Sequence, residues 1–353
     1  MNIKSLLIGS AAALAAVSGA QAADAIVAAE PEPMEYVRVC DAFGTGYFYI
    51  PGTETCLQIS GKVRFQVNVQ QDVLTTDQQV EDGYRAYSRG YLSLDAKSDT
   101  ELGTLTGHID IEADSDTTFL DGAWIQLGGF KAGWFYGFWD KGLNGETDIN
   151  DSGLAAIYNA VSYTYEAGAF SAAASLETFN NSTGSARGTL DAFDVRQGTW
   201  SDFSDDWGVS GQVSGAFGSA TADLLASYDF DAENVALRGF VSVDVGPGQL
   251  QGFAVWASGA SRYWDDSEWS VAASYKAQIN EKFSITPGFQ YWGTRNVDAD
   301  GDFVGDNDAW RAGLTFDYEI VKDLATKVSV QYDDDDTAAD SNWNGFVRLQ
   351  RSF

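Results

Sequence analysis

Two groups of oppositely charged residues are the best candidates for chemistry in this sequence. The basic group lies on two neighbouring stretches in which polar and apolar residues alternate. It consists of Lys62, Arg64, Arg85 and Arg89. The acidic group lies within the polar stretch 140–157, and it consists of Asp140, Glu146, Asp148 and Asp151. If these groups face each other across water, they create a transverse field that orients dipolar solutes and excludes apolar ones. The alternative is that each charge is merely hydrated and has no joint role.

Enzymatic chemistry finds little support in the sequence. The single histidine, His108, lies on the polar side of a stretch whose apolar side carries Leu105, Ile109 and Ile111. A membrane-embedded hydrolase would instead need a serine and histidine pair on its outer face. HExxH, CxxC and Walker-type glycine motifs are absent from the sequence. We therefore expect no enzyme and no cofactor, and the excess of 51 acidic over 21 basic residues excludes nucleic acid as a partner.

The basic residues belong to an extended element that begins near residue 57. In the stretch 57–70 (LQISGKVRFQVNVQ) every odd position is apolar or glycine and every even position is polar. Period-2 alternation predicts a β-strand with one apolar face and one polar face, the latter carrying Lys62 and Arg64. Such a strand, tilted by about 40°, rises roughly 35 Å, enough to cross an outer-membrane apolar band about 25 Å tall. A strand of a soluble sandwich is the alternative for this stretch alone.

Similar alternation recurs to the end of the chain. A single-chain bacterial barrel has an even number of strands, with both ends on the periplasmic side. Long connections should lie outside the cell and short ones in the periplasm. Assigning the connections from the first strand forward and from the last strand backward gives the same result only if one candidate stretch is not a strand. Residues 189–203 alternate poorly, so we assign 181–205 to one long external loop. The prediction is an all-β fold: a transmembrane antiparallel barrel of 16 strands that forms one domain, 56–353. The seventeen candidate stretches are 56–70, 84–98, 102–113, 118–129, 131–139, 158–167, 168–180, 189–203, 206–218, 219–230, 233–245, 248–260, 266–279, 282–296, 307–320, 323–334 and 342–353.

The residues before the barrel read as a processing signal followed by a lead-in. Lys4, an apolar run and Ala20-Gln21-Ala22 have the pattern of a signal peptide, residues 1–22. Residues 23–55 form a periplasmic lead-in, which starts with a flexible acidic segment. The only two cysteines are Cys40 and Cys56. In an exported protein we expect them to form a disulfide, with two free thiols as the alternative.

The residues around these cysteines resemble a known family. Tyr36-Val37-Arg38-Val39-Cys40, then Gly44-x-Gly46 followed by aromatic residues, and Ile50-Pro51-Gly52-Thr53 before Cys56 look like the opening of the alphaproteobacterial general porins. The ending Leu349-Gln350-Arg351-Ser352-Phe353 is similar to the same family, as is Phe217-Gly218-Ser219-Ala220 at a short turn. The resemblance implies a homotrimer in the bacterial outer membrane, with Phe353 as the signal read by the barrel-assembly machinery. The surroundings implied are outer-membrane lipid and lipopolysaccharide.

The expected function is passive diffusion of small hydrophilic solutes and ions through a water-filled lumen. The connection 140–157 is expected to fold inward and narrow the lumen, opposite the basic wall. Because acidic residues dominate the mouths, we expect weak cation selectivity that fades as salt rises. Asp148→Asn and Asp151→Asn should weaken this selectivity, whereas Arg85→Ala should strengthen it. A structural or adhesive barrel without conductance is the alternative function.

A metal site is not predicted. Asp298-Ala299-Asp300-Gly301-Asp302 resembles the first half of a calcium-binding loop. However, Ala309 stands at the position where such a loop needs its bidentate glutamate. These aspartates are therefore assigned to a solvated external loop.

Overall fold

The computed structural model describes residues 38–74, 80–150, 157–179, 207–336 and 341–353. The chain divides after Arg38 into two units, and the unit 39–353 contains the barrel. The predicted signal peptide and the start of the lead-in lie outside the described residues. Among the described residues, helices long and apolar enough to cross a membrane are absent.

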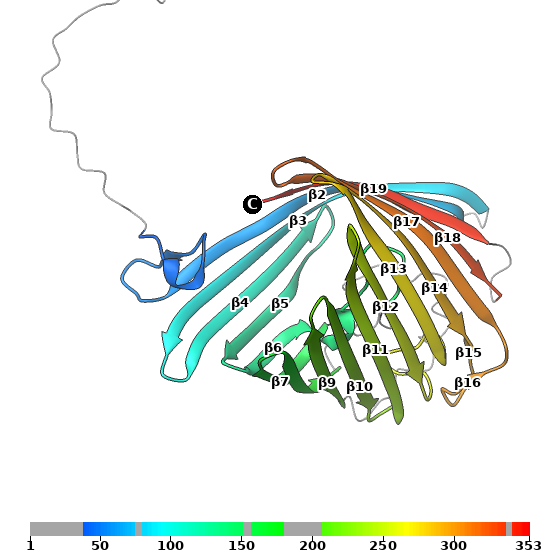
Figure 1. Cartoon of the computed structure of the whole chain (residues 1–353), viewed down its shortest axis with the longest axis horizontal. Helices are drawn as coiled ribbons and strands as arrows, with labels where there is room; N and C mark the ends of the chain where they lie inside the picture. The colour runs from blue at the N-terminus through cyan, green and yellow to red at the C-terminus, as the bar shows by residue number, and fades with distance from the viewer. Residues whose placement is uncertain (1–37, 75–79, 151–156, 180–206, 337–340) are drawn as a thin grey trace, which may run out of the picture. The chain divides into compact units, whose positions relative to one another are not determined.

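Sixteen strands form a closed antiparallel barrel, as predicted. Each strand pairs with its neighbours in sequence, and the last strand pairs with the first, so that Arg348 lies opposite Gln66. Figure 1 shows these two strands, β19 and β2, side by side. The first eight strands are β2 (Cys56–Leu74), β3 (Val80–Thr100), β4 (Gly103–Asp114), β5 (Thr118–Leu127), β6 (Phe130–Tyr136), β7 (Ile157–Ala167), β8 (Phe170–Thr178) and β9 (Trp207–Phe217). The other eight are β10 (Ala220–Asp229), β11 (Asn234–Val245), β12 (Gly248–Ala257), β13 (Trp269–Asn280), β14 (Phe283–Gly293), β17 (Asp308–Val321), β18 (Leu324–Asp335) and β19 (Asn342–Ser352).

The rejected stretch 189–203 lies outside the described residues. Its flanking strands β8 and β9 are direct hydrogen-bonded partners, with Leu176 opposite Val209. The barrel therefore closes with sixteen strands, and the predicted count is confirmed.

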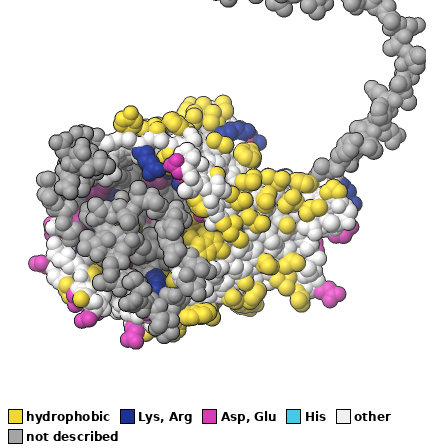
Figure 2. Space-filling model, turned by 180° about the vertical axis from the view of Figure 1, so that it is seen from behind, with side chains coloured by type: hydrophobic (Ala, Val, Ile, Leu, Met, Phe, Trp, Pro, Cys, Tyr) yellow, Lys and Arg dark blue, Asp and Glu magenta, His cyan; other side chains and the backbone are white. Residues whose placement is uncertain are grey.

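Strand alternation produces an apolar outside and a polar inside. On β2, Ile59, Val63 and Phe65 are about half exposed on the outer face, whereas Gln66 is 5% exposed inside. The same pattern on β11 places Arg238 inside and Val241 outside. Figure 2 shows hydrophobic side chains across the middle of the visible outer wall, with charged side chains mainly toward its ends. This distribution suits a wall that is surrounded by lipid.

The two ends of the barrel differ in the length of their connections. At one end consecutive strands are joined by two residues, as at 101–102 and 246–247. Gly246 has a φ of +59°, a conformation that favours glycine in so tight a turn. The other end carries the long connections, including 258–268 and the one that contains the hairpin β15 (Asn296–Val297) and β16 (Phe303–Val304). Short turns face the periplasm in outer-membrane barrels, which sets the orientation.

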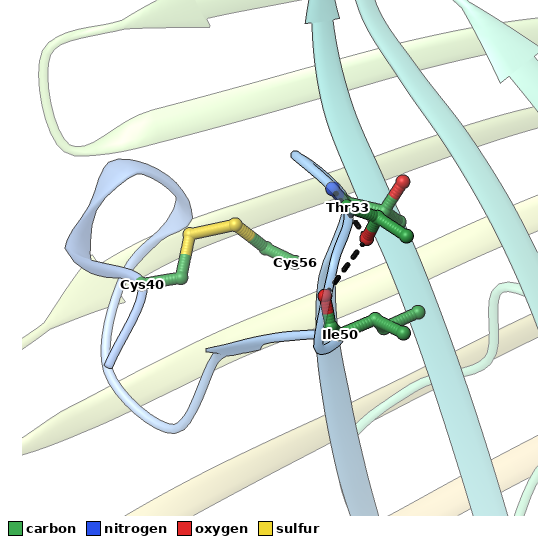
Figure 3. Close-up of a disulfide and its surroundings, with 5 residues drawn as sticks. Cys40, Ile50, Thr53 and Cys56 are labelled. Carbon is green, nitrogen blue, oxygen red and sulfur yellow. Dashed lines mark hydrogen bonds between the residues drawn. A yellow bond between two sulfur atoms is a disulfide. The ribbon is translucent and has the colours of Figure 1, made fainter. Parts of the chain in front are cut away.

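The segment before β2 is folded and held to it. It contains the one-turn helix η1 (Asp41–Phe43) and the short strand β1 (Phe48–Tyr49), which pairs with the start of β2. Cys40 and Cys56 form a disulfide that closes this segment (Figure 3), so the predicted pairing is confirmed. Thr53 donates from its hydroxyl to the carbonyl of Ile50 at 3.0 Å and tightens the turn before Cys56.

Candidate functional site in the barrel lumen

The connection after β6 folds into the lumen. Its described part, residues 137–150, is called the inward loop here, and it starts with the one-turn helix η2 (Phe138–Asp140). Arg238 of β11 holds both ends of this loop. Its guanidinium donates to the carbonyls of Phe138 at 2.6 Å, Trp139 at 2.8 Å and Asn150 at 3.2 Å. Because Arg238 is only 3% exposed, it fixes the loop from within the protein.

Wall residues from several strands bind the middle of the inward loop. The amide of Asn144 donates to Gln251 of β12 at 2.6 Å. The side-chain amide of Gln290 on β14 bonds the backbone of Ile149 twice. Its oxygen accepts from the Ile149 N–H at 2.6 Å, and its nitrogen donates to the Ile149 carbonyl at 2.8 Å. Lys141 forms an ion pair with Asp223 of β10. The loop is therefore fixed against the wall opposite β2–β5.

The tip of the inward loop reaches the strands next to the barrel closure. Glu146 accepts from Lys327 of β18 at 2.5 Å and from Arg348 of β19 at 3.3 Å. Its carbonyl also accepts from Gln331 at 2.8 Å. The carboxylate of Glu146 thus compensates two cations of the wall.

An apolar cluster fills the space between the inward loop and the wall. Trp139 of the loop is 1% exposed, and its indole donates to Ser227 at 2.9 Å. The connection 258–268 adds Tyr263 and Trp264, both fully buried and both within 6.4 Å of the Trp139 ring. Burial raises the pKa of Tyr263, whose hydroxyl bonds Glu177 of β8. Two inward-folded connections therefore share one hydrophobic core within the barrel.

The wall near the tip carries a group of cations, called the basic cluster here. Lys327 lies directly opposite Arg348 in the register, and Arg348 lies opposite Gln66 of β2. The ammonium of Lys62 lies 4.2 Å from the ring centre of Tyr91, and the guanidinium of Arg64 lies 5.0 Å from it. The basic cluster consists of Lys62, Arg64, Lys327 and Arg348.

The other two predicted basic residues lie on β3, at some distance along the strand from each other. Arg89 is opposite Arg64 in the register, but it is paired with Glu112 at 2.9 Å and Asp114 at 3.3 Å. Arg85 is exposed and lies opposite Asn68. Only Lys62 and Arg64 of the predicted four therefore belong to the basic cluster.

The predicted acidic residues have different environments. Glu146 contacts the basic cluster through Lys327 and Arg348. The carboxylate of Asp148 accepts from the backbone of Leu143 at 2.9 Å, within its own loop, and burial raises its pKa. Asp140 ends η2 and is exposed, while Asp151 lies outside the described residues.

Sequence reasoning missed Lys327, Arg348 and Arg238. The same alternation that placed Lys62 inside applies to them, since Arg348 stands between the outward Val347 and Leu349. Their partners in the inward loop lie far away in the sequence, so no local pattern could reveal them.

His108 is inward-facing, as the alternation predicted. Its ring lies between the carboxylates of Asp95, at 2.9 Å, and Asp110, at 2.8 Å. It also stacks on Trp124 of β5 at 4.6 Å. Among the described residues, groups of His, Cys, Asp or Glu side chains suited to a metal ion are absent. In the hairpin of β15 and β16, Asp298 accepts from the backbone of Asp300 and Asp302 at 3.0 Å.

A closed barrel with an apolar outside and a charged lumen defines a transmembrane channel fold of the bacterial outer membrane. Sequence comparison specifies the family, because the porin subfamily model matches residues 24–349. The chain belongs to this porin subfamily.

Named relatives cover the whole chain. The putative outer membrane protein y4fJ of Sinorhizobium fredii is 50% identical over 369 aligned positions, covering 100% of this chain and 99% of that protein. Outer membrane protein IIIA of Rhizobium leguminosarum is 42% identical, and the alignment covers 100% of this chain and 95% of that protein. Porin Omp2b of Brucella canis is 35% identical, with 100% of both chains covered. These relatives place the protein in the bacterial outer membrane and point to a channel rather than an enzyme.

Solved structures support the fold. The anion-selective porin from Comamonas acidovorans superposes with a TM-score of 0.65 at 12% identity, covering 85% of this chain and 100% of that chain. The outer membrane channel DcaP of Acinetobacter baumannii superposes with a TM-score of 0.63 at 15% identity, covering 86% of this chain and 99% of that chain. At these identities the likeness concerns the fold alone.

Proposed function

We propose that the protein is a general diffusion porin, which passes small hydrophilic solutes and ions without a cofactor. The observation that carries this proposal is the placement of the inward loop. The loop is bound to β10, β11, β12, β14, β18 and β19, while the charged inner face of β2–β4 lies across from it. A water path between the loop and β2–β5 would pass Lys62, Arg64, Arg89 and Glu112, and the loop would set its narrowest width.

The test is single-channel recording from the purified protein in a planar lipid bilayer. Discrete conductance steps are expected, since a polar path through a sixteen-stranded barrel is wide enough for hydrated ions. A properly folded protein that gives no steps would favour the second candidate, a structural or adhesive barrel without conductance. The apolar core within the lumen is the observation that favours this second candidate, because it fills part of the barrel.

We further propose that the channel is weakly cation-selective. Two effects compete, since the basic cluster attracts anions while the external loops and wall carry an excess of carboxylates. Glu146 offsets part of the basic cluster, so the surplus of acidic residues decides the preference. The acidic residues of the mouths include Asp298, Asp300, Asp302, Asp306, Asp334 and Asp336.

The proposed assembly is a homotrimer that contacts its copies through the outer face of β2–β5. Aromatic residues mark the turn end of most other strands, as with Phe170 against Phe217 at 5.7 Å. On β2–β5 the outward residues at this end are Leu57, Ser98, Leu105 and Leu127, which carry no rings. An apolar groove of about 540 Å³ crosses this face, lined in part by Ala96, Gly107, Ala123 and Ala132. Small residues and a missing aromatic row suit contact with protein rather than with the lipid interface.

A further inference from the structure

The disulfide-closed segment forms one side of a cavity at the turn end of the lumen. The cavity has a volume of about 460 Å³ and lies between Phe43 and the inner wall of β3–β5. Its wall residues include Asp95, Lys97, Thr106, Trp124 and Gln126. The position is the periplasmic mouth of the channel, away from the tip of the inward loop.

Several contacts hold Phe43 over this wall. The disulfide fixes the base of the segment, and Val39 forms a β-bridge with Phe48. Gln58 of β2 donates to the carbonyl of Thr45 at 3.1 Å. The ring of Tyr47 packs edge-on to Phe43. The ammonium of Lys97 lies 5.1 Å from the centre of the Tyr47 ring. The cavity is therefore a built feature rather than a gap beside a loose tail.

The cavity carries one charge of each sign, Asp95 and Lys97. Asp95 and Lys97 are two residues apart on β3 and face the same side. The carboxylate of Asp95 contacts His108 at 2.9 Å, and Lys97 lies over the ring of Tyr47. A ligand with a net charge would gain from one of them and be repelled by the other. An uncharged ligand with many hydroxyls can use both, because it donates to the carboxylate and accepts from the ammonium.

The remaining lining fits such a ligand. The side-chain nitrogen of Gln126 donates to the carbonyl of Gly128 at 3.0 Å, so the side-chain oxygen of Gln126 can accept a hydrogen bond from a ligand. Thr106 adds a hydroxyl, and Phe43 adds an apolar surface. The ring of Trp124 is held by stacking on His108 at 4.6 Å and by the ammonium of Lys131 at 4.3 Å.

We propose that this cavity is a binding site for small uncharged sugars, from monosaccharides to disaccharides. The volume falls within the range of small-molecule sites, roughly 300 to 1,000 Å³. The combination of polar groups with the rings of Phe43 and Trp124 suits a solute that has hydroxyl edges and an apolar face. This inference adds a specific binding site to the proposed diffusion function. It rests on that function in one respect, since sugars reach the cavity only through a water-filled lumen.

Saturation-transfer NMR on the folded, oxidised protein in detergent micelles tests the proposal, with glucose and sucrose as probes. Saturable signals with a dissociation constant of about 1 to 10 mM are expected for a small ligand in an open site. Phe43→Ala should weaken binding by about fivefold or more through loss of apolar contact, and Lys97→Gln by about threefold. Phe170→Ala on the outer face of β8 and Lys276→Gln on β13 are the matched controls and should stay within about twofold of the parent.

A serine replacement of Cys40 together with Cys56 provides a third variant. It should weaken sugar binding by releasing the segment, while circular dichroism confirms that the barrel is intact. The proposal is overturned if neither sugar gives a saturable signal, or if Phe43→Ala and Lys97→Gln both bind like the parent. A protein that conducts ions but binds neither sugar refutes only this subsite, whereas one that binds sugar without conducting refutes only the porin proposal.

Discussion

At the scale of single residues, Glu146 is where the inward loop meets the wall of the barrel. It forms ion pairs with Lys327 and Arg348, which lie side by side on adjacent strands. Partly exposed pairs of this kind contribute little to stability. Their effect on the local potential is larger, because Glu146 offsets cations along the proposed water path.

Glu146→Gln should therefore lower cation preference without unfolding the barrel. Removing the carboxylate deprives Lys327 and Arg348 of their shared acidic partner, and among the described residues only Lys327 keeps a second one, Asp317 at 3.6 Å. The permeability ratio of potassium to chloride should therefore fall by about twofold or more. Reversal potentials across a potassium chloride gradient measure this ratio.

Asp148→Asn is the matched control for that measurement. The structure revises the expectation for this residue, since its carboxylate accepts from the backbone of Leu143 rather than facing the basic cluster. Its raised pKa means that a neutral side chain suits the docked loop, and the stability it contributes is lost as pH rises through that pKa. Asparagine keeps the acceptor for Leu143, and this side chain contacts its own loop rather than the basic cluster, so selectivity should change little. Equal effects of the two substitutions would contradict the assigned role of Glu146.

At the scale of elements, the inward loop depends on one buried arginine. Arg238 satisfies three backbone carbonyls that lie at the two ends of the loop. Buried acceptors that lose their donor cost about 1 to 3 kcal/mol each. A neutral side chain at this position would therefore weaken the docking of the whole loop.

Arg238→Met should give a larger and noisier single-channel conductance. The loop would leave its docked position part of the time, because its carbonyls would seek water instead. Single-channel recording at constant salt measures both quantities. Arg311→Met serves as control, since Arg311 pairs with Asp333 on the neighbouring strand. An unchanged conductance in Arg238→Met would show that the loop does not limit the channel.

The disulfide is a second element-scale device. Cys56→Ser should lower the resistance of the N-terminal segment to unfolding by about 3 kcal/mol, the chain-entropy value for a loop of about 15 residues. Conductance should persist, because the strand pairing of the barrel does not depend on this bond. Denaturant titration with and without reductant measures the first effect. Alkylation of both thiols in untreated mature protein would refute the pairing itself.

The elements could be predicted because their signal is local. Alternation such as that of 57–70 identifies strands, and the lengths of the connections determine the direction of each one. The docking of the inward loop could not be predicted in this way. Glu146 and Asp148 look equivalent in the sequence, and only their distant partners, Lys327 for one and the loop's own backbone for the other, distinguish them.

At the scale of the whole molecule, we expect the net charge of −30 to favour cations through carboxylates that lie outside the narrowest point. Cation preference should fade as salt rises, because the Debye length falls from about 10 Å at 0.1 M to about 3 Å at 1 M. Reversal potentials at a fixed concentration ratio but different mean concentrations measure this decline. A preference that does not depend on salt would place the deciding charges at the narrowest point instead of the mouths.

The proposed trimer contact can be tested at Gly107 of β4. A Cβ atom at this outward glycine would meet no other atom within 4 Å, so a larger side chain leaves the protomer undisturbed. Gly107→Trp should fill the groove and reduce trimer formation, as measured by native mass spectrometry in detergent. Gly211→Trp on β9 is the control, since its Cβ would meet only a carbonyl oxygen at 3.9 Å. Trimers that persist in Gly107→Trp would exclude this face as the contact.

The apolar packing lies on one side of the barrel interior, so the residues that stabilise the fold are separate from the residues that line the proposed path. Residues that bury Trp139, Tyr263 and Trp264 hold the inward connections in place, so changes among them threaten the fold. The wall of β2–β4 faces these connections from the other side and carries much of the charge along the proposed path. Substitutions there can retune which solutes pass while leaving the scaffold intact. A barrel built in this way can diversify its permeability by single mutations, and it is a suitable starting point for engineering pores with chosen selectivity.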